Sequence, residues 1–399
     1  MSSASALDSA RALARRPGAK LGWAVVWALL LIAPYQLSNF WELTGLFAMG
    51  AIIGAIGLTI LTGTAGQLSL AHAFFLAVGA YGYCYFAGTS GGTTAASRVA
   101  GLGLPPLLAL VLAVLLAGLC GALFSPISSR LRGVYLGIAS IGLVFVGQHI
   151  LFNATSLTGG FNGRDAPPFS LFGFHFEDGS PNVVIAGTQF GGLEKLWYLG
   201  LLLVVLAYAY ARHVVSSRPG RALETVRDNE VAAAVMGVDV KRYKAAAFTL
   251  SSMYAGLAGV LLALAFERLV PDTFGFALSI SYLVMIVLGG LGSVGGAVLG
   301  AIFVSVLPQV FDHYSGSLPL LSQAGGSGLQ ASQAARLLYG AAIILVLLKA
   351  PGGLAGLGRR LRGGSDAAPP PVPAEDRPAS RTHPGDSSLS TPELKETAP

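Results

Sequence analysis

Long apolar runs that contain no Lys, Arg, Asp or Glu restrict this chain's fold more than any other feature. One run covers residues 245–266, and nine others lie between residues 21 and 348. An α-helix needs about 20 apolar residues to cross a bilayer. Only 11% of the 399 residues are charged, whereas soluble domains carry roughly 25%. The sequence therefore predicts an all-α, polytopic membrane protein.

Ten transmembrane helices are predicted, several of them short, at residues 21–37, 43–61, 67–86, 104–124, 134–152, 196–211, 245–266, 278–290, 294–307 and 337–348. Basic residues cluster in four segments outside these spans, namely 1–20, 125–133, 212–244 and the stretch after 349. With ten spans and the N-terminus inside, all four segments fall on the cytoplasmic side, as the positive-inside rule requires. An odd number of spans would break this pattern.

The predicted organisation has three parts. Residues 1–20 form a cytoplasmic leader, residues 21–350 the transmembrane domain, and residues 363–399 a disordered cytoplasmic tail rich in Pro, Ser and charge. Within the domain, 153–195 is the longest outside loop, which either caps a pore or connects two spans passively. Residues 212–244 form the cytoplasmic loop.

Two sets of five spans would be inverted relative to each other in the membrane, because five is an odd number. Many transporters are built from such inverted repeats, with glycine-broken segments near the substrate site. Each half of this chain has one Gly-rich interruption, at 62–66 and at 289–296. The two interruptions differ in ordinal position, so the inverted repeat is a hypothesis.

Motifs for chemistry are absent from the sequence. No P-loop, HExxH or CxxC occurs, so we predict no catalytic residue, metal site or cofactor. Cys84 and Cys120 lie in apolar runs and are expected to be buried thiols. The net charge of +6 follows membrane topology and does not indicate nucleic acid.

Acidic residues near the spans lie in loops or at span ends: Glu42, Asp165, Glu177, Asp178, Glu194, Glu267, Asp272 and Asp312. Ion-coupled carriers usually place an acid within a span, so another protein is expected to supply the energy.

The cytoplasmic segment 217–244 is charged and runs directly into the apolar run at 245. A serine at 216 or 217 can cap a helix with Pro219 in its first turn, and Gly237 suits a left-handed helix stop. One side of this helix is predicted to carry Ala222, Val226, Ala233 and Met236, with Asn229 as a polar member. A second helix from 240 would continue into the seventh span. The hairpin either docks in a groove of another protein or lies on lipid headgroups.

Four motifs carry a resemblance to a known family. They are SRPGRALETVRDNEVAAAVMGVDVKRYK followed by AAAFTLSSMYAGLAG (217–259), LTGTAGQLSLAHAFFLAVGAY (61–81), LRGVYLGIASIG (131–142) with TSLTGGFNG (155–163), and LVMIVLGGLGSVGGAVLGA (283–301). In this order they resemble the branched-chain amino acid permeases of ATP-binding-cassette (ABC) importers, of the LivM type. The resemblance covers residues 43–351.

The resemblance implies a translocating subunit in the inner membrane of a bacterium. Its partners would be a homologous permease, two cytoplasmic ATP-binding subunits that hydrolyse ATP, and an extracytoplasmic substrate-binding protein; this chain would not be an enzyme. The residues implied in coupling to the ATPases are Arg227, Asp228, Asn229, Glu230 and Gly237. The residues implied at a pore-lining break are Gly66, Gln67, Ser69 and His72, of which His72 could equally be a packing histidine.

The implied cargo is a branched-chain or other hydrophobic amino acid. Two departures bear on this: residues 143–145 read Leu-Val-Phe where many members have a small residue and an acid, and residues 294–296 read Val-Gly-Gly where a Pro is common. An acidic residue within 143–145 could have faced the ammonium group of an amino-acid substrate. The alternatives are an ABC permease for urea, short amides or an organic anion, an ion-coupled secondary transporter, and a passive channel.

Overall fold

The computed structural model describes residues 17–89, 99–131, 133–171, 174–176, 184–185, 188–189 and 191–315, and single residues or short pieces between 337 and 356. The chain divides into two units, Met1–Leu357 and Gly358–Pro399, and all the described residues belong to the first. The predicted leader lies largely, and the disordered tail wholly, outside the described residues, and the predicted tenth span is described in separate pieces.

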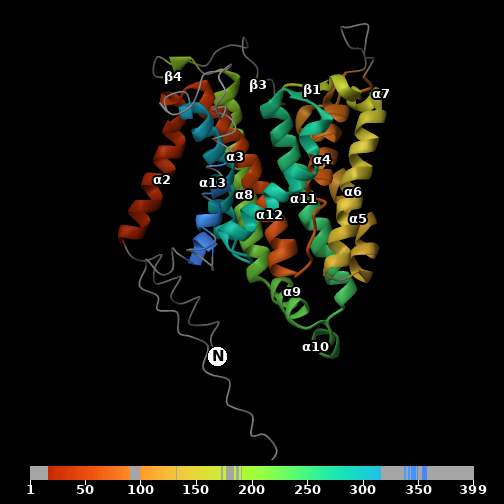
Figure 1. The fold of residues 1–399 in the computed structure, drawn as a ribbon. Helices are drawn as coiled ribbons and strands as arrows, with labels where there is room; N and C mark the ends of the chain where they lie inside the picture. Colours follow the sequence, from red (N-terminus) through yellow and green to blue (C-terminus); the bar gives the residue numbers. More distant parts are fainter. Residues whose placement is uncertain are drawn as a thin grey trace, which may run out of the picture. The chain divides into compact units, whose positions relative to one another are not determined.

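The described residues are mostly helical (Figure 1). The larger helices are α2 (Pro17–Gln36), α3 (Asn39–Leu58) continued by the π-helix η1 (Thr59–Thr64), α4 (His72–Ala87), α5 (Pro106–Arg130), α6 (Val134–Asn153), α8 (Gly192–Ser216), α11 (Val240–Phe266), α12 (Phe276–Gly289) and α13 (Val294–Ser315). Shorter helices are α7 (Thr155–Thr158), η2 (Gly160–Asn162), α9 (Arg218–Asp228), α10 (Glu230–Val235) and η3 (Pro271–Phe274).

Three antiparallel pairs of two-residue strands complete the described elements. They are β1 (Arg164–Asp165) with β6 (Arg268–Leu269), β2 (Ser170–Leu171) with β3 (Phe174–His175), and β4 (Val184–Ile185) with β5 (Thr188–Gln189). Most of this small amount of strand lies in the predicted outside loop 153–195. The pairing of β1 with β6 ties that loop to the segment after α11.

Among the residues that the structure describes, six helices are long and apolar enough to cross a membrane: Asn39–Thr64, Pro106–Arg130, Val134–Asn153, Gly192–Ser216, Val240–Phe266 and Val294–Phe311. Two shorter apolar helices are Trp27–Gln36 and Phe276–Gly289. Each of these corresponds to a predicted span, so the helical, multi-pass prediction is confirmed. The number of ten spans and the inverted repeat stay predictions.

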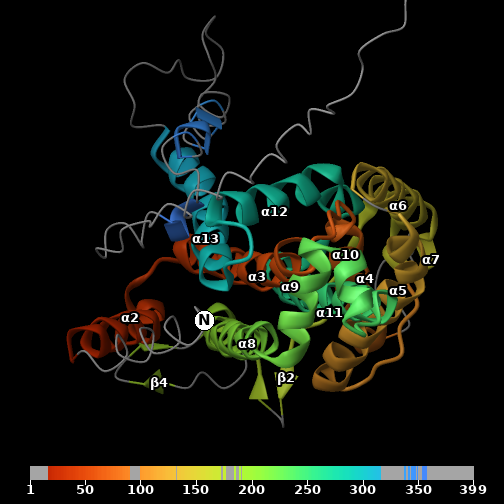
Figure 2. The same ribbon diagram turned by 90° about the horizontal axis from the view of Figure 1, so that it is seen from below.

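Helix α11 lies at the centre of the bundle and packs against α3, α4, α5 and α8 (Figure 2). Glycines allow this close packing, as small residues do between membrane helices. A Cβ atom on Gly79 of α4 would lie 2.2 Å from the Gly256 carbonyl oxygen of α11. A Cβ on Gly259 would lie 2.0 Å from the Leu76 carbonyl oxygen. The α4–α11 interface therefore has no room for even a methyl group at either position.

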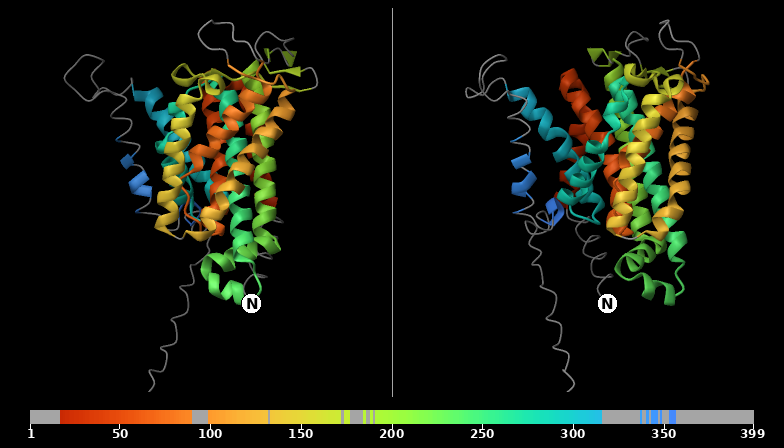
Figure 3. Two further views of the ribbon diagram at one scale, coloured as in Figure 1. Left: turned by 90° about the vertical axis from the view of Figure 1, so that its right-hand side faces the viewer. Right: turned by 45° about the vertical axis from the view of Figure 1, so that its right-hand side comes forward.

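The described parts of the predicted cytoplasmic loop, 212–244, and of the predicted outside loop, 153–195, lie at opposite ends of the bundle. Helices α9 and α10 lie at the lower end, whereas α7 and the strands β1, β3 and β4 lie at the upper end (Figures 1 and 3). At the upper end, the buried Arg164 donates hydrogen bonds to the carbonyl oxygens of Leu157, at 2.8 Å, and of Cys84. The bond to Cys84 adds to the one that this carbonyl already accepts from the Gly88 amide at 3.1 Å, so Arg164 ties the C-terminal end of α4 to α7. Loss of hydration on burial lowers the pKa of Arg164 below its ordinary value.

The third predicted span is wrong at its start. The prediction begins the span at residue 67, but residues 65–71 are non-helical and α4 begins at His72. Gly66 has a φ of +68°, which favours glycine. Three side chains accept hydrogen bonds from the freed amides: Ser140 from Leu70 at 2.8 Å, Ser69 from Ala71 at 3.3 Å and Ser279 from Ala73 at 3.0 Å. Non-helical backbone is stable at membrane depth only where protein groups satisfy it in this way.

Candidate functional site

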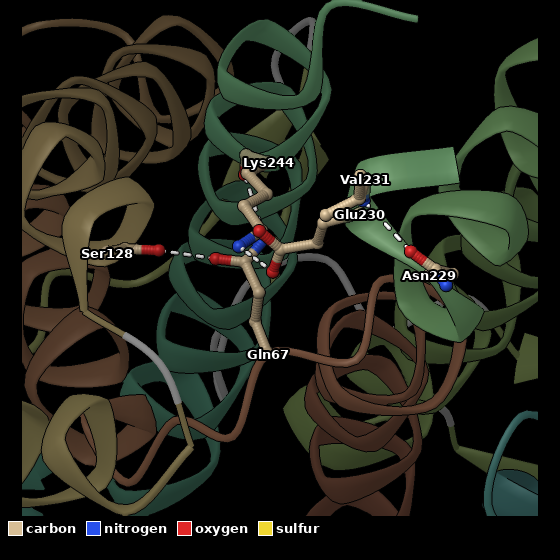
Figure 4. A network of polar contacts seen from close by, with 6 residues as sticks. All are labelled: Gln67, Ser128, Asn229, Glu230, Val231 and Lys244. Carbon is tan, nitrogen blue, oxygen red and sulfur yellow. Dashed lines mark hydrogen bonds and ion pairs between the residues drawn. The ribbon is translucent and has the colours of Figure 1, made fainter. Parts of the chain in front are cut away.

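The cytoplasmic hairpin contains two short helices before α11, where a single helix is predicted. The chain breaks at Asn229, whose φ of −157° and ψ of 107° are extended. The Asn229 side-chain oxygen accepts hydrogen bonds from the amides of Val231 and Ala232, both at 3.0 Å, as Figure 4 shows for Val231. Asn229 is therefore the N-cap of α10. The prediction that Asn229 is a polar member of one continuous helical face is wrong, because the helix is interrupted there and the Asn229 side chain accepts hydrogen bonds from the backbone of α10.

The predicted left-handed stop at Gly237 is confirmed. Gly237 has a φ of +84°, and its amide donates to the Ala234 carbonyl at 3.0 Å. The amide of Val238 donates to the Ala233 carbonyl, also at 3.0 Å. This pair of bonds is the Schellman motif, which ends a helix while satisfying its last carbonyls. Helix α10 is thus capped at both ends, although it has only six residues.

The predicted apolar row is divided by this break. Val226 and Ala233 are buried against the body of the protein, whereas Met236 is 65% exposed. Val231 and Val235 are 70% and 84% exposed. These three residues, Val231, Val235 and Met236, form what we call the apolar tip of the hairpin. Met236 belongs to the predicted row, but Val231 and Val235 do not, because the prediction assumed that one helical face continues through Asn229.

Behind the tip, a chain of polar contacts leads from α10 into the helical body (Figure 4). The Lys244 ammonium group, at the start of α11, lies 2.5 Å from a Glu230 carboxylate oxygen. The Gln67 side-chain amide donates to the Lys244 carbonyl oxygen at 3.1 Å. The Ser128 hydroxyl, at the end of α5, donates to the Gln67 side-chain oxygen. Gln67, Ser128 and Lys244 are buried, so the contacts join α10 to α5 and to the non-helical segment 65–71.

Arg227, at the end of α9, makes a second connection into the body. Its Nη1 atom donates to the Gly63 carbonyl oxygen at 2.8 Å, and its Nη2 atom lies 2.9 Å from an Asp228 carboxylate oxygen. A Cβ on Gly66 would lie 2.6 Å from the Arg227 Cγ atom. Two sets of residues predicted separately, the coupling residues and the residues of the break, therefore meet in the structure.

The four residues of the predicted break have different surroundings. Gly66 is exposed and Gln67 is tied to Lys244. Ser69 is buried next to the start of α4, where its hydroxyl accepts from the Ala71 amide. His72 is buried, and its ring centre lies 4.7 Å from that of Tyr282. The His72 Nε2 atom has no hydrogen-bond partner within the described residues.

Sequence reasoning missed two members of the polar chain. Ser128 is one of three serines in the last six residues of α5, in the segment 125–133 that the sequence assigns to the cytoplasm, and nothing local distinguishes it from the other two. Lys244 is grouped by the sequence with the basic residues of the cytoplasmic loop, although its side chain is only 6% exposed. The position of Lys244 directly before the long apolar run 245–266 is the one feature of the sequence that could have indicated its burial. Within the described ranges, no group of three or more His, Cys, Asp or Glu residues could hold a metal ion.

Comparison with known proteins identifies the family. The family model described as "Branched-chain amino acid transport system / permease component" matches residues 43–347. The chain belongs to this family. The high-affinity branched-chain amino acid transport system permease protein LivM of Escherichia coli K12 is 33% identical to this permease over 307 residues, which are 72% of this chain and 69% of LivM.

Other relatives of the permease include its LivH-type counterparts. The LivM protein of Salmonella typhimurium is also 33% identical, over 304 residues, 72% of this chain and 69% of that protein. The LivH permease protein of Salmonella typhimurium is 27% identical over 269 residues, 65% of this chain and 81% of LivH. No solved structure matches the permease. The resemblance drawn from the four motifs is confirmed, and the permease is a multi-pass membrane protein of a transport system.

Proposed function

We propose that this permease is a membrane-spanning subunit of an ABC importer for branched-chain or other hydrophobic amino acids. It has ten spans in two inverted halves and lies in the inner membrane with both termini in the cytoplasm. The family match and the LivM relatives, named for branched-chain amino acid transport, support the cargo. The LivH relatives support a homologous permease as its partner in the membrane. Two ATP-binding subunits and an extracytoplasmic binding protein complete the complex.

The apolar tip of the hairpin is the observation that carries this function. Val231, Val235 and Met236 are exposed on a helix that is capped at both ends, outside the helical body. A short helix with an apolar face suits a groove on another protein, and we assign that groove to the ATP-binding subunits. The residues predicted for coupling then have two tasks. Asn229 and Gly237 cap α10. Arg227 and Glu230 connect the hairpin to the helical body, and Asp228 orients Arg227.

The position of the acidic residues favours an external energy source. In the described long helices, acidic residues occur in the first or last turns: Glu42, Glu194 and Asp312. A carrier driven by protons or sodium usually needs such a group within a span. Alternating access in this permease is therefore driven by ATPase subunits that push the hairpin, and the chain itself performs no covalent chemistry.

Transport by the complete complex tests this function. The permease, its partner permease, the ATP-binding subunits and the binding protein are reconstituted in liposomes, and uptake of radiolabelled leucine is measured with and without ATP. We expect uptake only with ATP and all subunits present. Urea, a short amide and benzoate are tested as competing cargoes. Uptake by this chain alone, driven by an ion gradient, would refute the proposal, as would an ATP-independent leak.

Substitution at the tip tests the docking surface. We expect Val235→Asp to remove the ATP-binding subunits from the purified complex, because a carboxylate would lose its hydration in an apolar groove. Val235 is 84% exposed, so the substitution leaves the fold of the chain intact. Leu102→Asp, at an exposed site outside the hairpin, is the matched control. Retention of the ATPases by the Val235 variant would place the docking surface elsewhere.

A further inference from the structure

The two Gly-rich interruptions of the chain touch each other. Gly63 lies in η1 of the first half, and Gly292 lies in the turn between α12 and α13 of the second half. A Cβ on Gly63 would lie 2.4 Å from the Gly292 amide nitrogen and 2.7 Å from its Cα. Gly292 also has a φ of +80°, a conformation that L side chains rarely adopt. We call this backbone-to-backbone approach the glycine contact.

Arg227 of the hairpin reaches the glycine contact from outside the bundle. Its Nη1 atom donates to the Gly63 carbonyl at 2.8 Å and lies 3.9 Å from the point where a Cβ of Gly292 would be. The aliphatic stem of Arg227 passes against Gly66, where a Cβ would be 2.6 Å from Cγ. Arg227 therefore packs against Gly66, donates a hydrogen bond to Gly63 and comes within van der Waals range of the Gly292 position.

The chemistry of this site suits an arginine. The Gly63 carbonyl lies near the end of the π-helix, where carbonyl groups lack helical partners and the backbone dipole is negative. A guanidinium group stays charged and offers five donors in a fixed plane. Asp228 lies 2.9 Å from the Nη2 atom and orients the plane while Nη1 remains directed at Gly63.

We propose that Arg227 is a positioning residue that holds the glycine contact closed and transmits hairpin movement to both halves of the permease at once. The inference rests on the proposed function, since it assumes that partner ATPases move the hairpin. It assigns Arg227 a task different from docking: the apolar tip binds the partner, and Arg227 connects that tip to the two interruptions. The polar chain through Glu230, Lys244 and Gln67 ends beside the first interruption, whereas Arg227 bonds Gly63 at the point where Gly63 meets Gly292 of the second interruption.

Substitution of Arg227 in the complete complex gives the first test. Arg227→Gln removes the charge, and Arg227→Lys keeps it. Arg221→Gln is the matched control, because Arg221 lies on the same helix, is exposed, and within the described residues its side chain donates only to the nearby Ser216 carbonyl. For Arg227→Gln we expect the ATPases to stay bound and hydrolysis to continue, while leucine uptake per ATP falls about tenfold, the loss expected for one charge-assisted hydrogen bond. The lysine variant should recover part of the loss, and Arg221→Gln should equal the wild type.

Cross-linking across the glycine contact gives a test that needs no transport. Thr62→Cys and Leu291→Cys flank the contact, in a chain whose Cys84 and Cys120 are replaced by Ala. A bismaleimide about 10 Å long should join the two cysteines, because each lies one Cα–Cα step of about 3.8 Å from a touching glycine. We expect Arg227→Gln to lower the cross-linking rate several-fold, and Arg221→Gln to leave it unchanged.

Gly63→Ala provides an independent variant of the same contact. Its methyl group must separate the two backbones, so the variant should reproduce the lower uptake per ATP and the slower cross-linking. Combined with Arg227→Gln it should add little, because the two changes act on one contact. Loss of ATPase binding by Arg227→Gln, or cross-linking equal to the Arg221 control, would overturn the inference. If the wild type imports no amino acid, the proposed function fails, and the cross-linking still decides the role of Arg227.

Discussion

The ion pair between Lys244 and Glu230 places a buried positive charge where α11 leaves the body of the protein. Lys244 is almost fully enclosed and its ammonium group lies 2.5 Å from the Glu230 carboxylate. A lysine in such a place is stable only when its charge is paired. The pair therefore fixes α10 against α11. Its main contribution is to set the position of α10, and its contribution to the net free energy of unfolding is smaller.

We predict that Glu230→Gln destabilises the permease by roughly 1–3 kcal/mol, because it leaves the Lys244 charge without its carboxylate. The melting midpoint of the purified chain in detergent measures this. The double variant Glu230→Gln with Lys244→Met should recover most of the loss, since it removes both charges. Glu224→Gln, an exposed carboxylate on α9, is the control. Equal midpoints for Glu230→Gln and Glu224→Gln would show that the pair contributes nothing.

Helix α10 depends on its caps, because six residues are too few for a stable isolated helix. We predict that Asn229→Ala weakens the helix by about 1 kcal/mol, whereas Asn229→Asp keeps the acceptor and is tolerated. Hydrogen exchange of the Val231 and Ala232 amides should become about fivefold faster in the alanine variant. Unchanged exchange in that variant would mean that packing on the body, and not the cap, holds α10.

Helices α4 and α11 can pack closely because glycines lie at their interface. We predict that Gly79→Ala destabilises the chain by about 1–3 kcal/mol, because the added methyl group overlaps the Gly256 carbonyl. Gly142→Ala on α6 is the matched control, since nothing lies within 4 Å of its Cβ position. Thermal denaturation of the purified chain compares the two. A Gly79 variant as stable as the Gly142 variant would show that the helices can separate at low cost.

For the molecule as a whole, the sidedness of the membrane is the property on which every coupling argument depends. The hairpin and the outside loop lie at opposite ends of the bundle (Figure 3). With Cys84 and Cys120 replaced by Ala, we predict that Met236→Cys reacts with an impermeant maleimide only in inside-out vesicles. Phe161→Cys, exposed at the other end, should react only in right-side-out vesicles. Reaction of Met236→Cys from the outside would place the hairpin beyond the reach of cytoplasmic ATPases.

The sequence by itself determined where most helices are and which end of the bundle is basic. The observed bounds of α6 and α11 lie within five residues of the predicted ones, because the length of an apolar run and its flanking charges are local properties. Gly237 could be predicted for the same reason, since a left-handed helix stop is read from a few neighbouring residues.

Only the tertiary structure decided how the interruptions are built and what they touch. The start of α4 at His72 depends on hydroxyl groups of Ser140 and Ser279, which lie 70 and 206 residues away from their partners. The burial of Lys244 and the approach of Gly63 to Gly292 likewise need groups from distant helices. Backbone and charge inside a membrane protein must be satisfied by whatever lies beside them in space, and no local pattern of residues records those neighbours.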